Sequence, residues 1–188
     1  MTQTKNFSDV VVKNAAKGEV SAVFSTFNHL DLDGDVTLPG AIKDGAEVVI
    51  SAYGHQSHYG ALPVGRGKIR TTPTVAILEG QFFMSTESGR DTFEIVKELG
   101  ELGEWSYSLH DVVSERGTWQ GEPANLLKSI RVKEVSPVLL GAAGPGATRT
   151  LVAKAASHVD PDLHSIATAL RIRTGMQALQ SKYLKETP

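Results

Sequence analysis

The sequence predicts a mainly β domain with one internal helix, an α+β fold. Short segments that alternate apolar and polar residues, and that are rich in β-branched side chains, follow one another at close intervals. Gly, Pro and Asp separate these segments, which is typical of the turns between antiparallel strands. Only one stretch between them, residues 88–102, carries apolar residues at helical spacing.

Strands are expected where the alternation is clearest. They are assigned to residues 10–13, 19–26, 48–53, 64–71, 75–83, 104–113 and 126–139. The helix over residues 88–102 places Phe93, Val96 and Leu99 on one face. Ser88 is its expected N-cap, and Asp91 supplies a negative charge near its start.

The composition changes after Leu140, where the run GAAGPGAT has the Gly and Pro content of a linker. We therefore expect a β-rich domain over residues 1–143, a mobile linker over residues 144–160 and a C-terminal helical segment over residues 161–188. This last segment has apolar residues at helical spacing and Asp160 as a cap before it. Its apolar stripe is only partial, so the helix is expected to need a partner.

The bulk composition excludes several classes of function. The 188 residues, 19 of them basic and 21 acidic, suit one near-neutral domain, which indicates neither a nucleic-acid partner nor an anionic membrane surface. The chain has no Cys, so covalent catalysis would have to use Ser or Thr. No apolar run reaches the roughly 18 residues of a membrane span, and the N-terminus has no signal-peptide pattern. We expect a soluble, cytoplasmic protein.

Two motifs could suggest metals. In residues 31–42 the run Asp-Leu-Asp-Gly-Asp resembles a calcium loop, but Val36 and Ile42 stand where an EF-hand requires Gly and a bidentate Glu. A tight Asp-Gly turn is the better interpretation. His55 and His58 are three residues apart in a Gly-bounded context without an HExxH pattern, which disfavours a metal. No metal and no cofactor are expected.

The histidine pair is nevertheless the most informative feature, because a Leu-Pro-Val-Gly-Arg-Gly turn into a strand follows it. A possible general base is thus joined to a rigid turn, which favours an enzyme. A second feature is the strand over residues 104–113. There Ser106, Ser108 and His110 share one face, opposite an apolar face formed by Trp105, Tyr107 and Leu109.

These serines could simply line the solvated side of an ordinary sheet. His110 cannot be the base for Ser106 on the same strand, because their Cα atoms would be roughly 13 Å apart. A base would have to come from another strand. A third feature is Glu134, which alternation places with Ser136 on the apolar face of Ile130 and Val132. Such a carboxylate needs a partner, either a histidine or, in an edge strand, solvent or an Arg.

In these blocks the sequence resembles the prohead maturation proteases of tailed bacteriophages with HK97-type capsids. These are serine peptidases similar in fold to the herpesvirus assemblins. Four blocks in the family's order carry the resemblance, and with the segments between them they cover roughly residues 20–143: residues 31–42 (DLDGDVTLPGAI), the histidine block of residues 53–69, residues 105–109 (WSYSL) and residues 133–142 (KEVSPVLLGA). Ser108 departs from the family pattern, which often has Gly there.

The resemblance implies an assemblin-like antiparallel β-barrel with flanking helices and a serine endopeptidase. Ser106 would be the nucleophile, with Ser108 as the alternate. His55 would be the base, with His58 as the alternate at a shorter spacing from the turn. Glu134 would orient the histidine, unless an assemblin-like Ser-His-His arrangement uses a second histidine, His110 or the other member of the pair.

The resemblance also implies partners and a location. The substrates would be the major capsid protein with its scaffolding segment, and the protease's own termini, cut inside the immature shell in the host cytoplasm. A homo-oligomer is expected, and no nucleic acid or membrane. The leading alternative is a catalytically silent capsid assembly or scaffold protein on the same fold. A weaker one is a small β-barrel binding domain outside phage biology.

Overall fold

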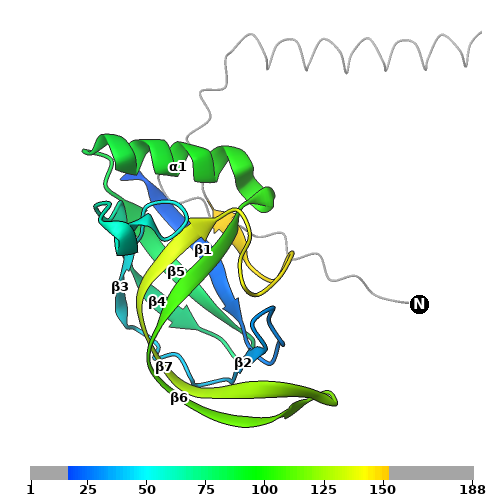
Figure 1. The fold of residues 1–188 in the computed structure, drawn as a ribbon. Coiled ribbons are helices and arrows are strands. Elements are labelled where there is room, and N and C mark those ends of the chain that lie inside the picture. Colours follow the sequence, from blue (N-terminus) through cyan, green and yellow to red (C-terminus); the bar gives the residue numbers. More distant parts are fainter. Residues whose placement is uncertain (1–16, 153–188) are drawn as a thin grey trace, which may run out of the picture. The chain divides into compact units, whose positions relative to one another are not determined.

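The computed structural model describes residues 17–152, which form a mixed eight-stranded sheet with one α-helix at its side (Figure 1). Two short 3-10 helices, η2 and η3, interrupt the strand order. The elements in chain order are β1 (Glu19–Thr26), β2 (Asp35–Thr37), β3 (Glu47–Ile50), η2 (Gln56–Tyr59), β4 (Gly65–Thr71), β5 (Val75–Phe82), α1 (Glu87–Leu99), η3 (Gly100–Leu102), β6 (Glu104–Trp119), β7 (Glu122–Val138) and β8 (Arg149–Val152).

The sheet is open, so the expected closed antiparallel barrel is wrong. The long strand β7 pairs with β6 along one side and with both β2 and β3 along the other, and β4, β5, β1 and β8 follow beyond β3. Both β2 and β3 run parallel to β7, whereas all other pairings are antiparallel. Because β7 has 17 residues, two short strands fit end to end beside it.

Strands β6 and β7 form a hairpin whose far end extends beyond the rest of the sheet (Figure 1). Its turn residues Gln120 and Gly121 both have positive φ, 51° and 93°, as a two-residue turn of type I′ requires. The expected strand ended at residue 113, but pairing continues to Trp119. In β6 of this arm, residues 111–118 are all exposed and largely polar, so the sequence of that strand shows no alternation there.

The helix α1 covers one end of the sheet with the apolar face that its sequence predicts. Phe93 and Val96 are buried, and the ring of Phe93 lies 5.5 Å from that of Phe82 in β5, measured between centroids. The N-cap is Thr86 rather than the expected Ser88, since the Thr86 side chain accepts a hydrogen bond from the Gly89 amide. The helix ends at Leu99, and η3 continues to Leu102.

The segment expected as a mobile linker belongs to the sheet in its first half. Residues 141–148 make turns whose carbonyls accept hydrogen bonds from Leu32 N, from the Thr26 hydroxyl and from the His29 ring. After them β8 pairs with β1. The part of the expected linker that the structure describes, residues 144–152, therefore belongs to this sheet.

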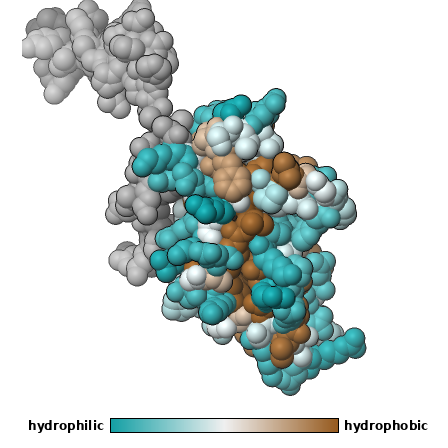
Figure 2. Space-filling model, turned by 90° about the vertical axis from the view of Figure 1, so that its left-hand side faces the viewer, coloured by the Kyte–Doolittle hydropathy of each residue, from teal (hydrophilic) through white to brown (hydrophobic). Residues whose placement is uncertain are grey.

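Two of the expected elements, the strand over residues 10–13 and the helical segment over residues 161–188, lie outside the described residues. Among the helices of the part that is described, none is long and apolar enough to cross a membrane. One face of the molecule carries a band of apolar surface between hydrophilic margins (Figure 2). The most exposed large apolar side chains of the described part are Tyr59, Leu62, Leu102 and Leu139.

Candidate active site

The position of Glu134 is set by an irregularity in the pairing of β6 with β7. Tyr107 lies opposite Val135, but Leu109 lies opposite Val132, so β7 has one extra residue at this point. This bulge breaks the alternation of β7, and Val132 and Val135 both reach the core. Alternation predicted Glu134 on the face of Ile130 and Val132. Because of the bulge, it does not lie on that face.

Glu134 lies instead on the outer face of the sheet. Its neighbour in β3 is Val49, a partly exposed residue, whereas Val135 lies beside the buried Ile50. Nevertheless Glu134 is only 4% exposed. The loop between β3 and β4 covers it, and this loop carries both histidines of the sequence motif.

Backbone contacts to the end of β7 hold this loop. Ser51 N donates to Val135 O at 3.0 Å, and Gly54 N donates to Pro137 O at 2.9 Å. Between them, the His55 amide donates to the hydroxyl of Ser136 at 2.9 Å. His55 has φ of 59°, which is uncommon for a residue other than glycine, and it stands directly before η2. These contacts compensate for the strain of that conformation.

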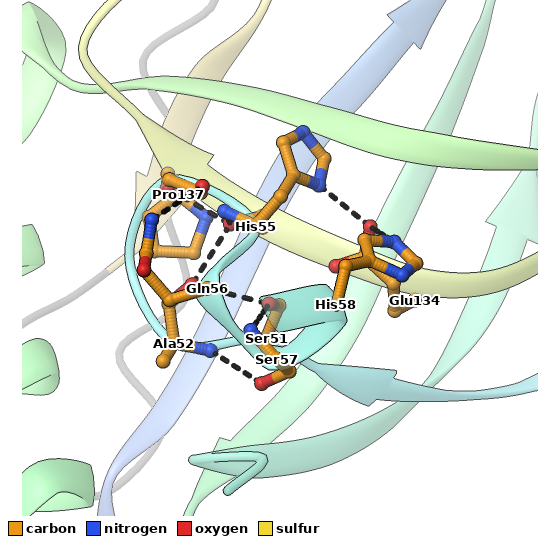
Figure 3. A network of polar contacts seen from close by, with 10 residues as sticks. Ser51, Ala52, His55, Gln56, Ser57, His58, Glu134 and Pro137 are labelled. Carbon is orange, nitrogen blue, oxygen red and sulfur yellow. Dashed lines mark hydrogen bonds and ion pairs between the residues drawn. The ribbon is translucent and has the colours of Figure 1, made fainter. Parts of the chain in front are cut away.

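Both histidine rings meet the carboxylate of Glu134 (Figure 3). His55 Nδ1 lies 2.6 Å from Glu134 Oε1, and His58 Nε2 lies 3.2 Å from the same oxygen. The side chains of His55 and His58 are 27% and 42% exposed, so the rings close the carboxylate off from solvent while remaining accessible themselves. The expected pairing of Glu134 with a histidine is thus present, and it involves both members of the pair.

The serines of β6 lie on the same face as this cluster. Ser106 is directly opposite Ser136, the residue that anchors the His55 amide, and Ser108 is opposite the bulge that carries Glu134. Trp105 is buried in the core and Tyr107 packs against it, so Ser106 and Ser108 share the opposite face, as the sequence pattern predicted. Within the described residues neither serine hydroxyl hydrogen-bonds a histidine.

His110 completes the group, with its ring centroid 6.4 Å from that of His58. Three buried polar atoms of this group have no hydrogen-bond partner among the described residues: Ser108 Oγ, His110 Nε2 and Glu134 Oε2. Buried polar atoms are normally paired, so unpaired ones gathered at one place make this cluster the candidate site. The structure thus brings His55, His58 and Glu134 into contact, and His110 beside them, while Ser106 and Ser108 lie on the adjacent strand.

Sequence reasoning missed the role of Ser136. Its hydroxyl accepts the His55 amide and lies within 3.3 Å of the Ala52 and Pro137 carbonyl oxygens, which joins the histidine loop to β7. The available signal was its place two residues after Glu134, since alternation puts both side chains on one face. Ser136 is fully buried, as expected of a structural anchor.

A pocket lies beside the turn of residues 31–35; Ser106 is among its lining residues, but none of the clustered histidines is. Asp31 Oδ1 accepts the amides of Asp33 and Asp35 at 3.0 and 2.8 Å, and Gly34 has φ of 82°, which confirms the predicted Asp-Gly turn. Burial raises the pKa of the Asp31 carboxyl above its ordinary value. Burial likewise raises the pKa of the Tyr107 hydroxyl, which hydrogen-bonds Thr37 at 3.0 Å.

Comparison of the chain with protein-family models, with curated proteins and with solved structures found no match. The chemistry of the site therefore follows from its geometry. A histidine whose Nδ1 is hydrogen-bonded to a buried carboxylate has its tautomer and ring orientation fixed. Its Nε2 is then available to accept a proton, and Ser106 and Ser108 offer hydroxyls on the strand that pairs with β7.

Proposed function

We propose that this chain is a serine endopeptidase that processes capsid and scaffold proteins during prohead maturation. The observation that carries the proposal is the 2.6 Å contact between His55 Nδ1 and the buried Glu134. A histidine oriented by a buried carboxylate is the second and third part of a Ser-His-acid catalytic unit. Three of the four sequence blocks that resemble prohead proteases contribute these residues: the histidine block, residues 105–109 and residues 133–142.

His55 is favoured over His58 as the base for two reasons. Its Nδ1 makes the shorter contact with Glu134, which leaves Nε2 free to take a proton. His58 engages Glu134 through Nε2, so the nitrogen that would reach outward in a triad is already occupied. His55 is also held by its amide to Ser136, opposite Ser106 across the β6–β7 pairing.

Ser106 is favoured over Ser108 as the nucleophile. Directly opposite residues of an antiparallel pair have Cβ atoms about 5 Å apart, which puts Ser106 next to Ser136 and the His55 loop. Ser108 Oγ, by contrast, is buried, and a nucleophile must meet a substrate carbonyl. The Ser108 hydroxyl lies opposite the bulge instead and has no hydrogen-bond partner among the described residues.

The reaction follows the general scheme for such a unit. Ser106 Oγ attacks the peptide carbonyl while His55 Nε2 accepts its proton, and His55 then protonates the leaving amine. Water, deprotonated by the same histidine, releases the acyl group from Ser106. Glu134 stabilises the imidazolium that forms in both steps. By resemblance, the substrates are the major capsid protein with its scaffolding segment and the termini of the protease itself.

The decisive experiment is mass spectrometry of the major capsid protein co-expressed with this chain. Ser106→Ala should abolish cleavage, because the variant lacks the proposed nucleophile, and it should melt like the wild type. Ser108→Ala is the matched control and should cause a mild loss.

Loss of cleavage in Ser108→Ala alone, with both variants folded, would move the nucleophile to Ser108. Full processing by both single variants and by the double variant would refute the serine peptidase. A catalytically silent assembly protein on the same fold would then be the better interpretation.

A further inference from the structure

We propose that His55, His58 and Glu134 form a binding site for a zinc-class divalent cation, and that the bound ion switches the peptidase off. The regulatory part of this inference rests on the proposed function, whereas the binding part does not. His55 Nδ1, His58 Nε2 and a Glu134 carboxylate oxygen all lie within 4.8 Å of one another. They come from one loop and one strand that four backbone and side-chain hydrogen bonds hold together.

The distances suit a tetrahedral ion. Zinc binds histidine nitrogens and carboxylate oxygens at about 2.0–2.2 Å, so its ligand atoms are about 3.3 Å apart. The 3.2 Å between His58 Nε2 and Glu134 Oε1 already matches this spacing. His55 Nδ1 lies 2.6 Å from Oε1 and forms a hydrogen bond that the ion would replace. Binding would release the proton of this bond and increase the distance between the two atoms slightly.

Glu134 provides an independent sign of a missing ligand. The residue is only 4% exposed, yet its Oε2 has no hydrogen-bond partner among the described residues. A buried carboxylate oxygen without a partner carries a desolvation cost that a cation would remove. The partly exposed rings of His55 and His58 leave a path by which an ion can enter.

The donor set selects the kind of ion. Two imidazoles and one carboxylate are the ligands of many catalytic zinc sites, which keep a fourth position open. Magnesium and calcium prefer sets made of oxygen ligands alone. The bend of the loop at His55, with its positive φ, brings two histidines that are only three residues apart in a non-helical segment to the same carboxylate.

The consequence for catalysis follows from the nitrogen that the ion would occupy. A neutral histidine that binds metal through Nδ1 carries its proton on Nε2. That Nε2 cannot accept the proton of a serine, and Glu134 no longer orients the ring as an imidazolium partner. The metal-bound protein is therefore an inactive peptidase, and removal of the ion restores the base.

Binding is tested by isothermal titration of the full chain with Zn²⁺ after treatment with a chelator. The wild type should bind one ion per chain, and Glu134→Gln and His58→Ala should each weaken binding by at least about tenfold. His29→Ala is the matched control, because this exposed histidine contacts Ala143 O and does not belong to the cluster, and it should bind like the wild type. Melting curves confirm that each variant is folded.

Absence of binding by the wild type, or equal binding by the Glu134 and His58 variants, would overturn the site. The activity arm uses the capsid-protein cleavage assay, in which Zn²⁺ should inhibit the wild type and excess chelator should restore cleavage. A peptidase that instead requires Zn²⁺ would overturn the switch. Zinc binding without any peptidase activity would refute the proposed function and its switch but keep the site, so the two failures are distinguishable.

Discussion

Glu134 is the residue on which the geometry of the site depends, because one of its oxygens meets both histidines. It is buried on the outer face of the sheet only because the loop after β3 lies over it. A buried carboxylate with polar partners is stable, whereas loss of a partner leaves an uncompensated charge at a cost of roughly 3–5 kcal/mol. A substitution of Glu134 can therefore lower activity by unfolding the protein, so the melting temperature has to be measured beside the cleavage rate.

Glu134→Gln should lower cleavage at least about 100-fold while the protein remains folded. The amide keeps the shape and one oxygen, but it cannot stabilise the imidazolium or fix the histidine tautomer. The measurement is the cleavage rate, with the melting temperature as the control. Full activity in a folded Gln variant would exclude Glu134 as the third member and direct attention to His110, which lies beside His58.

The two histidines are expected to differ in their effect. His55→Ala should stop cleavage as completely as Ser106→Ala, because members of a catalytic unit are strongly non-additive. His58→Ala should retain measurable cleavage, since His55 keeps its own contact with Glu134. The measurement is the cleavage rate of the single His55, His58 and Ser106 variants and of the double variant of His55 and Ser106. The reverse pattern would assign the base to His58, and tolerance of both changes would favour a silent assembly protein.

At the scale of the elements, α1 depends on a glycine in its first turn. Alanine normally favours a helix over glycine by about 1 kcal/mol. At Gly89, however, an added Cβ would overlap the Phe83 carbonyl oxygen and lie 2.7 Å from the capping hydroxyl of Thr86. Gly89→Ala should therefore destabilise the protein by about 1–3 kcal/mol.

The measurement for α1 is the free energy of unfolding in urea. Ser88→Ala, at the exposed neighbouring position, is the matched control and should change that free energy by less than about 0.5 kcal/mol. Unchanged or increased stability of Gly89→Ala would show that the N-terminus of α1 shifts easily away from Phe83.

The turn before β2 predicts a dependence on pH. Burial raises the pKa of Asp31, so the folded state takes up a proton at a higher pH than the unfolded chain. The ionised carboxylate therefore costs stability at neutral pH, and this cost disappears as the pH falls through the folded-state value. Asp31→Asn keeps the oxygen that accepts the Asp33 and Asp35 amides and removes the charge.

The Asn variant should therefore melt at the same or a higher temperature than the wild type at pH 7, and its advantage should shrink in acid. Melting temperatures across that range test the sign, with Asp33→Asn as an exposed control. A variant that is less stable at neutral pH, with the difference also shrinking in acid, would show that the hydrogen bonds to the carboxylate outweigh its burial.

At the scale of the whole molecule, the sequence predicts what depends on local pattern and misses what depends on pairing. The strand β1 has the predicted bounds, and the core face of α1 is the predicted one. The bulge beside Glu134 could not be predicted, because it arises from the register of β6 against β7. A partner for Glu134 was nevertheless expected, since a buried carboxylate needs one, and the resemblance implied that this partner is a histidine.

The short strands were missed for the same reason. β2 has three residues, and β8 follows a run of Gly, Ala and Pro that resembles a linker. Only the neighbouring strand makes such a segment extended, and β8 gains its place by pairing with β1. The alternation of apolar and polar residues is the same in open and closed sheets, so the sequence pattern could not show whether the sheet closes into a barrel.

The place of β8 fixes where the chain can be shortened. The Thr150 hydroxyl accepts the indole N–H of the buried Trp105 at 3.0 Å, and Thr148 accepts the amide of the same residue. A chain that ends at Val152 keeps both contacts, whereas a chain that ends at Thr148 loses β8. The indole N–H would then be buried without its partner, at a cost of about 1–3 kcal/mol.

The chain ending at Val152 should therefore melt like the full chain and cleave an added capsid-protein substrate at the same rate, but it should be packaged in fewer copies per prohead. This last effect follows from the resemblance, in which terminal segments serve incorporation into the shell. The chain ending at Thr148 should melt at a lower temperature. Loss of cleavage in the longer chain would mean that residues beyond Val152 complete the catalytic fold, and unchanged packaging would remove their proposed role in assembly.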